Sequence, residues 1–188
     1  AIQNIVREII LPEDAILIHT SGSQPMSVLG YAATPNIGVF YPLQTFSKAK
    51  KIDFIDVPVF VESDSSEVTD VLMKLGKSIS NKVKKITSHD RKALHVAAVF
   101  ASNFSNHMLT IAKEVADKNG LDFELLKPLI AETLNKSLAI DPKQAQTGPA
   151  KRGDLEILDN HIGFLQDDPQ VAEIYKIISQ HIIDQSAR

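Results

Sequence analysis

The residue types best suited to chemistry form a polar stripe on a long predicted helix in the second half of the chain. At about 100° per residue, a set of polar side chains lies within roughly 40° of His95, with Asn103 at its edge: Arg91, Ser102 and Asn106. Histidine exchanges protons near neutral pH, so His95 is a candidate acid or base, and Asn103 and Asn106 are suited to orienting a carbonyl or carboxylate group. A second interpretation stays open, in which the asparagines bond neighbouring helices and His95 is a core histidine.

Small polar residues follow two predicted strands, and both loops are candidate ligand sites. The first strand, "AILI", leads into His19, Thr20, Ser21 and Gly22, and the second, "IGVFY", leads into "PLQT", which contains Gln44 and Thr45. Ligands of open parallel sheets gather beyond the carboxyl ends of the strands, so two polar loops at one edge are stronger evidence than one. An ordinary strand-to-helix turn explains the first loop equally well.

A third candidate is the loop "AQTGPAKRGD", which interrupts a helical region. Gly148 allows tight backbone geometry, and Arg152 offers a planar fork suited to a carboxylate or phosphate. Asp154 is placed to cap the next helix. The alternative is a plain connector in which Arg152 pairs with Asp154 or another nearby acid.

Composition excludes several classes of protein. The 188 residues include 20 basic and 23 acidic side chains, for a formal charge of −3, whereas nucleic-acid binders normally carry a basic excess. No apolar run approaches the length of a membrane span. The absence of cysteine excludes disulfides and a Cys nucleophile and fits the cytoplasm, and the six scattered histidines show no metal-ligand spacing.

The elements that must position these residues change in character near residues 86–90. Before this point, predicted strands and helices alternate: strands within 15–23, 37–42, 57–63 and 82–87, and helices within 2–10, 24–32 and 65–79. Continuous apolar runs favour a parallel sheet that is covered on both faces. Residues 1–87 are therefore predicted to form part of a doubly wound α/β sheet.

Residues 88–188 are predicted to be all helical. The stretch 88–120 contains no breaker and can form one helix of about 30 residues, apolar on most faces and so buried on most sides. A second helix at 121–140 is expected to kink at Pro128. Helices at 155–166 and 168–185 follow the loop, and Asp168 is the predicted cap of the last one.

Four stretches, "HTSGS", "GVFYPLQTFSK", "RKALHVAAVFASNFSNHM" and "AQTGPAKRGD", together resemble a bacterial Rossmann-like family assigned as NADP oxidoreductases, with a C-terminal helical domain of unknown function. That family is similar in plan to pyrroline carboxylate reductase and to 6-phosphogluconate dehydrogenase-like enzymes. The resemblance implies that 1–87 is the C-terminal part of a Rossmann-like dinucleotide-binding domain and that 88–188 is an all-helical dimerisation and substrate domain. In that family a βαβ unit with a glycine-rich phosphate loop comes first, and because this sequence lacks it we expect the chain to be a fragment.

The resemblance also implies roles for the candidate residues. The cofactor would be NADP or NAD, with its nicotinamide near these residues: His19, Thr20, Ser21, Gly22, Gln44 and Thr45. The chemistry would be hydride transfer to or from a C=N or C=O carbon, with His95 as proton donor and with Asn103 and Asn106 facing the cleft. Thr147, Gly148 and Arg152 would close the cleft of an intertwined homodimer, and Arg152 would recognise an anionic small-molecule substrate.

Three hypotheses remain open from the sequence. The first is an NAD(P)-dependent reductase or dehydrogenase. The second is a non-catalytic nucleotide or metabolite-binding protein on the same scaffold. The third is a helical dimerisation module whose polar stripe is purely structural. Under all three hypotheses we expect no nucleic-acid partner and no membrane partner.

Overall fold

The structure is a computed structural model that describes residues 2–12, 14–47 and 51–187. Its contacts divide the chain into two units, of which the first ends at His107 and the second begins at Met108. This division falls inside the long helix. The domain boundary expected between residues 87 and 88 stays a prediction.

Four short strands form the sheet of the first unit, in the order β1-β2-β3-β4. They are β1 (Leu17–His19), β2 (Ile37–Pro42), β3 (Val59–Glu62) and β4 (Val83–Lys85). β1 pairs with β2 and β3 with β4 in parallel, as predicted, but β2 and β3 are antiparallel, with Phe40 opposite Val61. The described residues between β2 and β3 form no helix. Parallel neighbours need a crossover connection, usually a helix, so β3 instead runs back antiparallel to β2.

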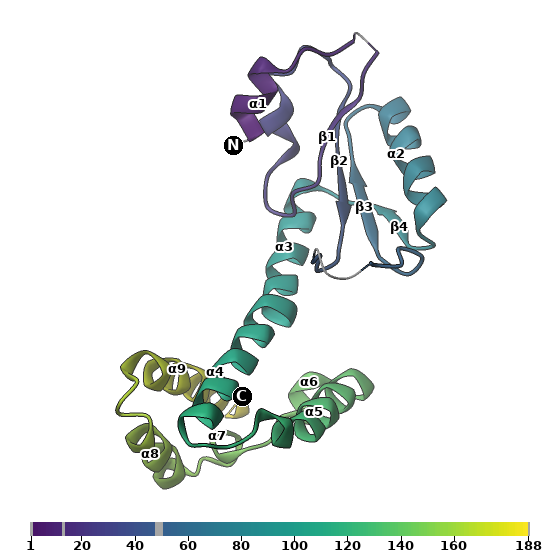
Figure 1. Cartoon of the computed structure of the whole chain (residues 1–188). Coiled ribbons are helices and arrows are strands. Elements are labelled where there is room, and N and C mark those ends of the chain that lie inside the picture. The colour runs from purple at the N-terminus through teal and green to yellow at the C-terminus, as the bar shows by residue number, and fades with distance from the viewer. Residues whose placement is uncertain (1, 13, 48–50, 188) are drawn as a thin grey trace. The chain divides into compact units, whose positions relative to one another are not determined.

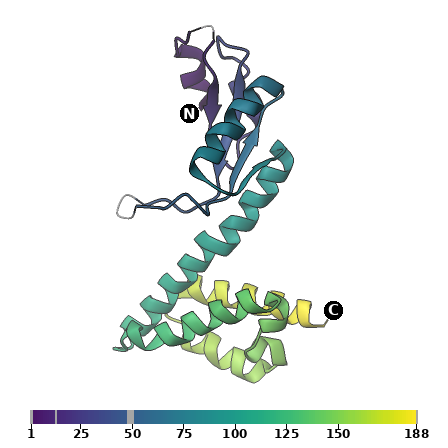
Figure 2. The same cartoon turned by 90° about the vertical axis from the view of Figure 1, so that its right-hand side faces the viewer.

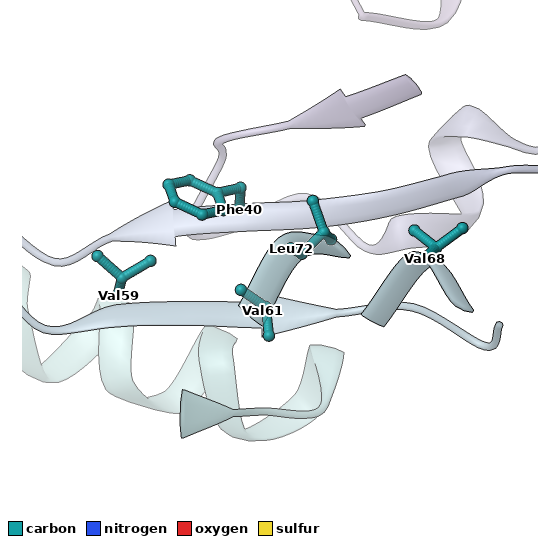
Figure 3. Close-up of a cluster of buried hydrophobic side chains, with 5 residues drawn as sticks. All are labelled: Phe40, Val59, Val61, Val68 and Leu72. Atoms are coloured by element: carbon teal, nitrogen blue, oxygen red, sulfur yellow. The ribbon is translucent and has the colours of Figure 1, made fainter. Parts of the chain in front are cut away.

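Alternating side chains of the strands pack on both faces of this sheet. Helix α2 (Ser66–Ile79) covers one face and lies in front of the strands in Figure 2. Figure 3 shows the cluster on this face: Phe40, Val59, Val61, Val68 and Leu72. Val39 and Tyr41 point to the opposite face, where α1 (Ile2–Glu8) and the 3₁₀ turn η1 (Met26–Leu29) supply the packing (Figure 1). Burial of both faces matches the apolar runs of the sequence.

Capping side chains set where the main helices begin. Ser65 Oγ accepts the backbone N–H of Val68 at 3.2 Å, so α2 begins at Ser66, within the predicted range 65–79. Thr87 caps α3 (Ser88–Ala98) in the same way. Asp168 accepts the N–H of Val171 at 3.2 Å and starts α9 (Pro169–Ser186), which confirms the expected cap.

The long helix predicted from residue 88 runs through three consecutive segments. α3 continues into η2 (Val99–Phe104), which is a π-helix, and then into α4 (Ser105–Lys118). The expectation that this helix is buried on most sides is wrong for the single chain. Val96, Phe100 and Phe104 are 49%, 64% and 48% exposed among the described residues.

The second unit is built from helices. After α4 come the 3₁₀ turn η3 (Phe123–Leu126) and a series of helices: α5 (Lys127–Ala139), α6 (Pro142–Ala145), α7 (Pro149–Arg152), α8 (Leu155–Phe164) and α9. Pro128 lies in the first turn of α5, where proline is tolerated, so the predicted kink is wrong and the residue marks a helix start instead. The short α7 packs against α8 and α9 (Figure 1).

Candidate functional site

Tyr41 and His95 form a hydrogen-bonded pair in the first unit. The Tyr41 hydroxyl, near the end of β2, lies 3.0 Å from Nδ1 of His95 on α3, and their rings meet edge to face at 6.0 Å. Tyr41 is 8% exposed, and this burial raises the pKa of its hydroxyl, with the Arg91 charge acting in the opposite direction. The phenol therefore keeps its proton at neutral pH and remains a hydrogen-bond donor.

The loop after β1 is folded on itself by its own side chains. The N–H of Ser21 donates to Nδ1 of His19 at 3.1 Å, so the proton of the neutral ring is on Nε2, which donates to the Pro25 carbonyl at 3.3 Å. Burial, together with the Arg91 charge, lowers the pKa of His19. Both ring nitrogens of this predicted cofactor residue are thus engaged within the loop, and Thr20 beside it is exposed.

Arg91 holds this loop from the helix side. Its Nη1 donates to the carbonyl oxygens of Ser21 at 2.7 Å, Gly22 at 3.2 Å and Gln24 at 2.8 Å. Its Nη2 lies 2.9 Å from Oε2 of Glu62, and the Arg91 side chain is completely buried. The sequence placed Arg91 on the stripe that faces a cleft, whereas the structure makes it the internal link between loop, strand and helix.

Ser88 completes this internal network. Its hydroxyl donates to Oε1 of Glu62 at 2.6 Å and accepts the N–H of Met26, at the start of η1, at 3.3 Å. The sequence reasoning missed Glu62 altogether. The available signal was an acid at the end of an apolar strand, because a carboxylate in that position needs a cationic partner when it is buried.

A groove of about 680 Å³ opens beside the Tyr41–His95 pair. One wall comes from the segment after β2 and includes Gln44 and Thr45, and the other comes from α3 and η2 and includes Asn103. The volume is in the range of ordinary small-molecule sites. The structure thus brings together four of the predicted site residues, which are Gln44, Thr45, His95 and Asn103.

The π-helical segment decides which asparagine shares the groove with His95. Each turn of a π-helix is wider than an α-helical turn, so successive residues advance by a smaller angle. The spacing rule of 100° per residue therefore fails beyond Ala98, which is where η2 begins. Asn103 lines the groove, whereas Asn106, which the α-helical spacing put closer to His95, is outside the residues that line it.

The other predicted residues belong to the second unit. Thr147 and Gly148 line a mostly apolar cavity of about 540 Å³ among α4, α7, α8 and α9. Nη2 of Arg152 lies 2.7 Å from Oδ2 of Asp154, which is the pairing described by the connector alternative. The prediction that Asp154 caps α8 is wrong, because its carboxylate binds Arg152 and makes no capping bond. The convergence of this loop and the polar stripe on one crevice stays a prediction.

Two further observations bear on the site chemistry. His161 Nδ1 lies 2.7 Å from the Tyr175 hydroxyl, a pair at the apolar cavity of the second unit that the sequence analysis missed. Across the described part of the chain, no cluster of His, Asp and Glu side chains is arranged to hold a metal ion. No described helix combines the length and apolar character needed to cross a membrane.

These features define a mixed α/β protein with a small, mostly parallel sheet followed by an all-helical region. Residues 57–182 match the family described as domain of unknown function DUF2520, and the chain belongs to this family. No protein with a curated description matches.

Two solved structures are similar to the chain. The first is BF3122 of Bacteroides fragilis, named a "putative NADP oxidoreductase", with 43% identity and a TM-score of 0.89 over 97% of this chain and 69% of that one. The second is protein TM1727 of Thermotoga maritima, with 23% identity and a TM-score of 0.74 over 99% of this chain and 75% of that one. The first confirms the family resemblance drawn from the sequence motifs, and the second shows the fold.

Proposed function

We propose that this chain is part of an NADP-dependent oxidoreductase that transfers a hydride to or from a small C=N or C=O substrate. The name given to the Bacteroides relative supports the cofactor and the class of reaction. The observation that carries the proposal is the hydrogen-bonded Tyr41–His95 pair, at 3.0 Å, beside a groove of small-molecule size. The carboxyl end of β2, which pairs in parallel with β1, lies at this groove, and ligands of parallel sheets gather at such strand ends.

The residues present fit one end of the cofactor. Gln44 and Thr45 offer amide and hydroxyl groups at the groove, where they are suited to hold the carboxamide of a nicotinamide. The backbone carbonyl oxygens of Ser21 and Gly22 accept hydrogen bonds from the Arg91 guanidinium. The sequence contains no G-x-G-x-x-G segment to bind the pyrophosphate, so this assignment concerns the nicotinamide end alone. When bound, NADP would supply or accept the hydride.

Side chains of this protein would then transfer the proton and limit the access of water to the reacting atoms. His95 would donate its ring proton to the substrate nitrogen or oxygen as hydride arrives, while its Nδ1 atom takes up the hydroxyl proton of Tyr41, so that the imidazole stays neutral; the reverse direction would return both protons. Asn103 orients the polar group of the substrate from the η2 side of the groove. Leu43, Leu94 and Val99 line the same groove and reduce the access of water to the reacting atoms.

Blocking the groove tests the proposal. In the full-length protein, NADPH should raise the melting temperature, and Ala101→Trp should abolish this shift because Ala101 is exposed at the groove. Ala131→Trp, at an exposed position of α5, is the matched control and should keep the shift. The absence of an NADPH effect on the full-length protein would count against the proposal. NADPH binding without turnover of any imine or 2-keto acid would favour the non-catalytic alternative.

Arg152 is proposed as the anchor of an anionic substrate. In the structure its partner is Asp154, so the substrate would have to displace a carboxylate that is 35% exposed. Arg152→Ala should raise KM for the substrate, whereas the neighbouring Lys151→Ala should not. The homodimer implied by the family resemblance belongs to the same proposal, and light scattering on the full-length protein tests it.

A further inference from the structure

We infer that His95 acts through its Nε2 atom, and that Tyr41 and Gly22 are positioning residues that fix the imidazole in one tautomer. The inference rests on the proposed function for the use of the proton. The tautomer and the orientation of the ring, however, follow from the contacts of the chain itself. They can be measured without any substrate.

The hydrogen bond of Tyr41 decides which nitrogen of His95 carries the proton. Within the described residues, Nδ1 of His95, at 3.0 Å, is the hydrogen-bond partner of the Tyr41 hydroxyl. If Nδ1 carried a proton and donated it to the phenol oxygen, the phenolic proton of a largely buried side chain would lack an acceptor among the described residues, which is costly. The phenol therefore donates to Nδ1, and the proton of neutral His95 is on Nε2.

Gly22 closes the Nδ1 edge of the ring. A Cβ atom at residue 22 would lie 2.4 Å from Nδ1 of His95 and 2.9 Å from Cζ of Tyr41, so the glycine backbone lies directly against the pair. The φ angle of Gly22 is not positive. Glycine is therefore needed at this position for the space that it leaves, and not for an unusual backbone conformation. With Nδ1 bound and covered, the edge of His95 that is left for a ligand in the groove is the one that bears Nε2.

Arg91 links the loop after β1 to the helix that carries the imidazole of His95. Arg91 precedes His95 by one helical turn on α3, and its guanidinium binds the carbonyl oxygen of Gly22 at 3.2 Å and that of Ser21 at 2.7 Å. The helix that carries His95 therefore also carries the group that holds Gly22 against it. The ring orientation is set before any ligand arrives, which is the condition for efficient proton transfer.

The tautomer can be read from long-range ¹H–¹⁵N spectra of the full-length protein labelled with ¹⁵N-histidine, with the His95 signals identified by their loss in His95→Asn. We expect an unprotonated Nδ1 and a protonated Nε2 in the neutral imidazole of the wild type. Tyr41→Phe should replace this pattern by one averaged over both tautomers. A proton on Nδ1 in the wild type, or an unchanged pattern in Tyr41→Phe, would overturn the inference.

The second unit supplies a matched control. Tyr175→Phe removes the equivalent 2.7 Å hydrogen bond to His161 and should change the His161 signals while those of His95 stay as in the wild type. Gly22→Ala should displace the ring and give the averaged His95 pattern, and an unchanged pattern would remove Gly22 from the inference. If Gly22→Ala does not fold, the Tyr41→Phe comparison decides alone.

Turnover separates this inference from the proposed function. If the full-length protein reduces a substrate with NADPH, Tyr41→Phe should lower kcat by up to roughly 100-fold with little change in KM, because substrate binding is retained while the proton donor loses its fixed orientation. An unchanged kcat would overturn the positioning role of Tyr41. A protein with the expected tautomer but no turnover would contradict the proposed function and leave the geometry of His95 intact.

Discussion

Arg91, in the first turn of α3, and Glu62, at the end of β3, form a largely buried ion pair with 2.9 Å between Nη2 and Oε2. The same guanidinium binds the loop after β1, and the same carboxylate accepts the hydroxyl of Ser88. The pair therefore joins two strand ends to the helix that carries His95. Its hydrogen bonds satisfy both charges, which is the condition for keeping an ion pair in a protein interior.

The first prediction concerns the stability that depends on this pair. Arg91→Met leaves Glu62 without its cation and three loop carbonyls without their donor, and should lower the free energy of unfolding by about 3–5 kcal/mol. Urea denaturation measures the change. Arg152→Met breaks an exposed pair instead and should cost no more than about 1 kcal/mol. Equal effects of the two substitutions would refute the role given to Arg91.

The second prediction concerns the pH dependence of stability through His19. Burial lowers its pKa in the folded state below the ordinary value of 6.5, so on acidification the unfolded chain binds this proton first. The contribution of His19 is therefore full above pH 6.5 and is lost as the pH falls below that value toward the lower folded-state pKa. His19→Asn keeps an acceptor for the Ser21 N–H and should flatten the stability curve below pH 6.5. Parallel curves for wild type and variant would contradict this.

The third prediction concerns the loop at Gly148. Its φ of 102° and ψ of 175° lie in a region that only glycine occupies readily, so Gly148→Ala should lower the free energy of unfolding by about 1–3 kcal/mol. Gly163, in α8, is the matched control, because a Cβ there meets no atom within 4 Å. Gly163→Ala should be neutral or stabilise by up to about 1 kcal/mol. A Gly148→Ala variant as stable as Gly163→Ala would show that the backbone at 148 is not constrained.

The fourth prediction separates a catalytic His95 from a structural one. His95→Gln should lower kcat by about 10²-fold or more, because an amide does not transfer protons, while the NADPH affinity of the full-length protein stays close to that of the wild type. His107→Gln, on the same long helix but outside the groove, should leave kcat unchanged. If kcat of His95→Gln stayed within about twofold of the wild type, the core-histidine interpretation would hold.

Local patterns in the sequence predicted much of this fold, because the forces behind them act over a few residues. Apolar runs located the four strands, and Asp168 marked the start of the last helix. The rule on strand ends predicted Gln44 and Thr45 as candidate ligand residues, and the structure places both in the groove beside His95, a neighbour that the rule did not predict.

The failures concern contacts between distant residues and one local irregularity. The antiparallel pairing of β2 with β3 depends on the route of the connection, and the apolar pattern of a buried strand is the same in either direction. Nothing in the sequence marks the π-helical turn that brings Asn103 into the groove in place of Asn106. The burial of Arg91 depends on Glu62, 29 residues earlier, so the helical pattern alone placed it on a polar surface.

The most direct test of the central claim is a crystal structure of the full-length protein with NADP⁺ bound. We expect the nicotinamide ring to lie in the groove, with its carboxamide bonded to Gln44 or Thr45 and its ring facing Nε2 of His95. A cofactor whose nicotinamide is ordered elsewhere, with the Tyr41–His95 groove free of it, would refute the proposed function.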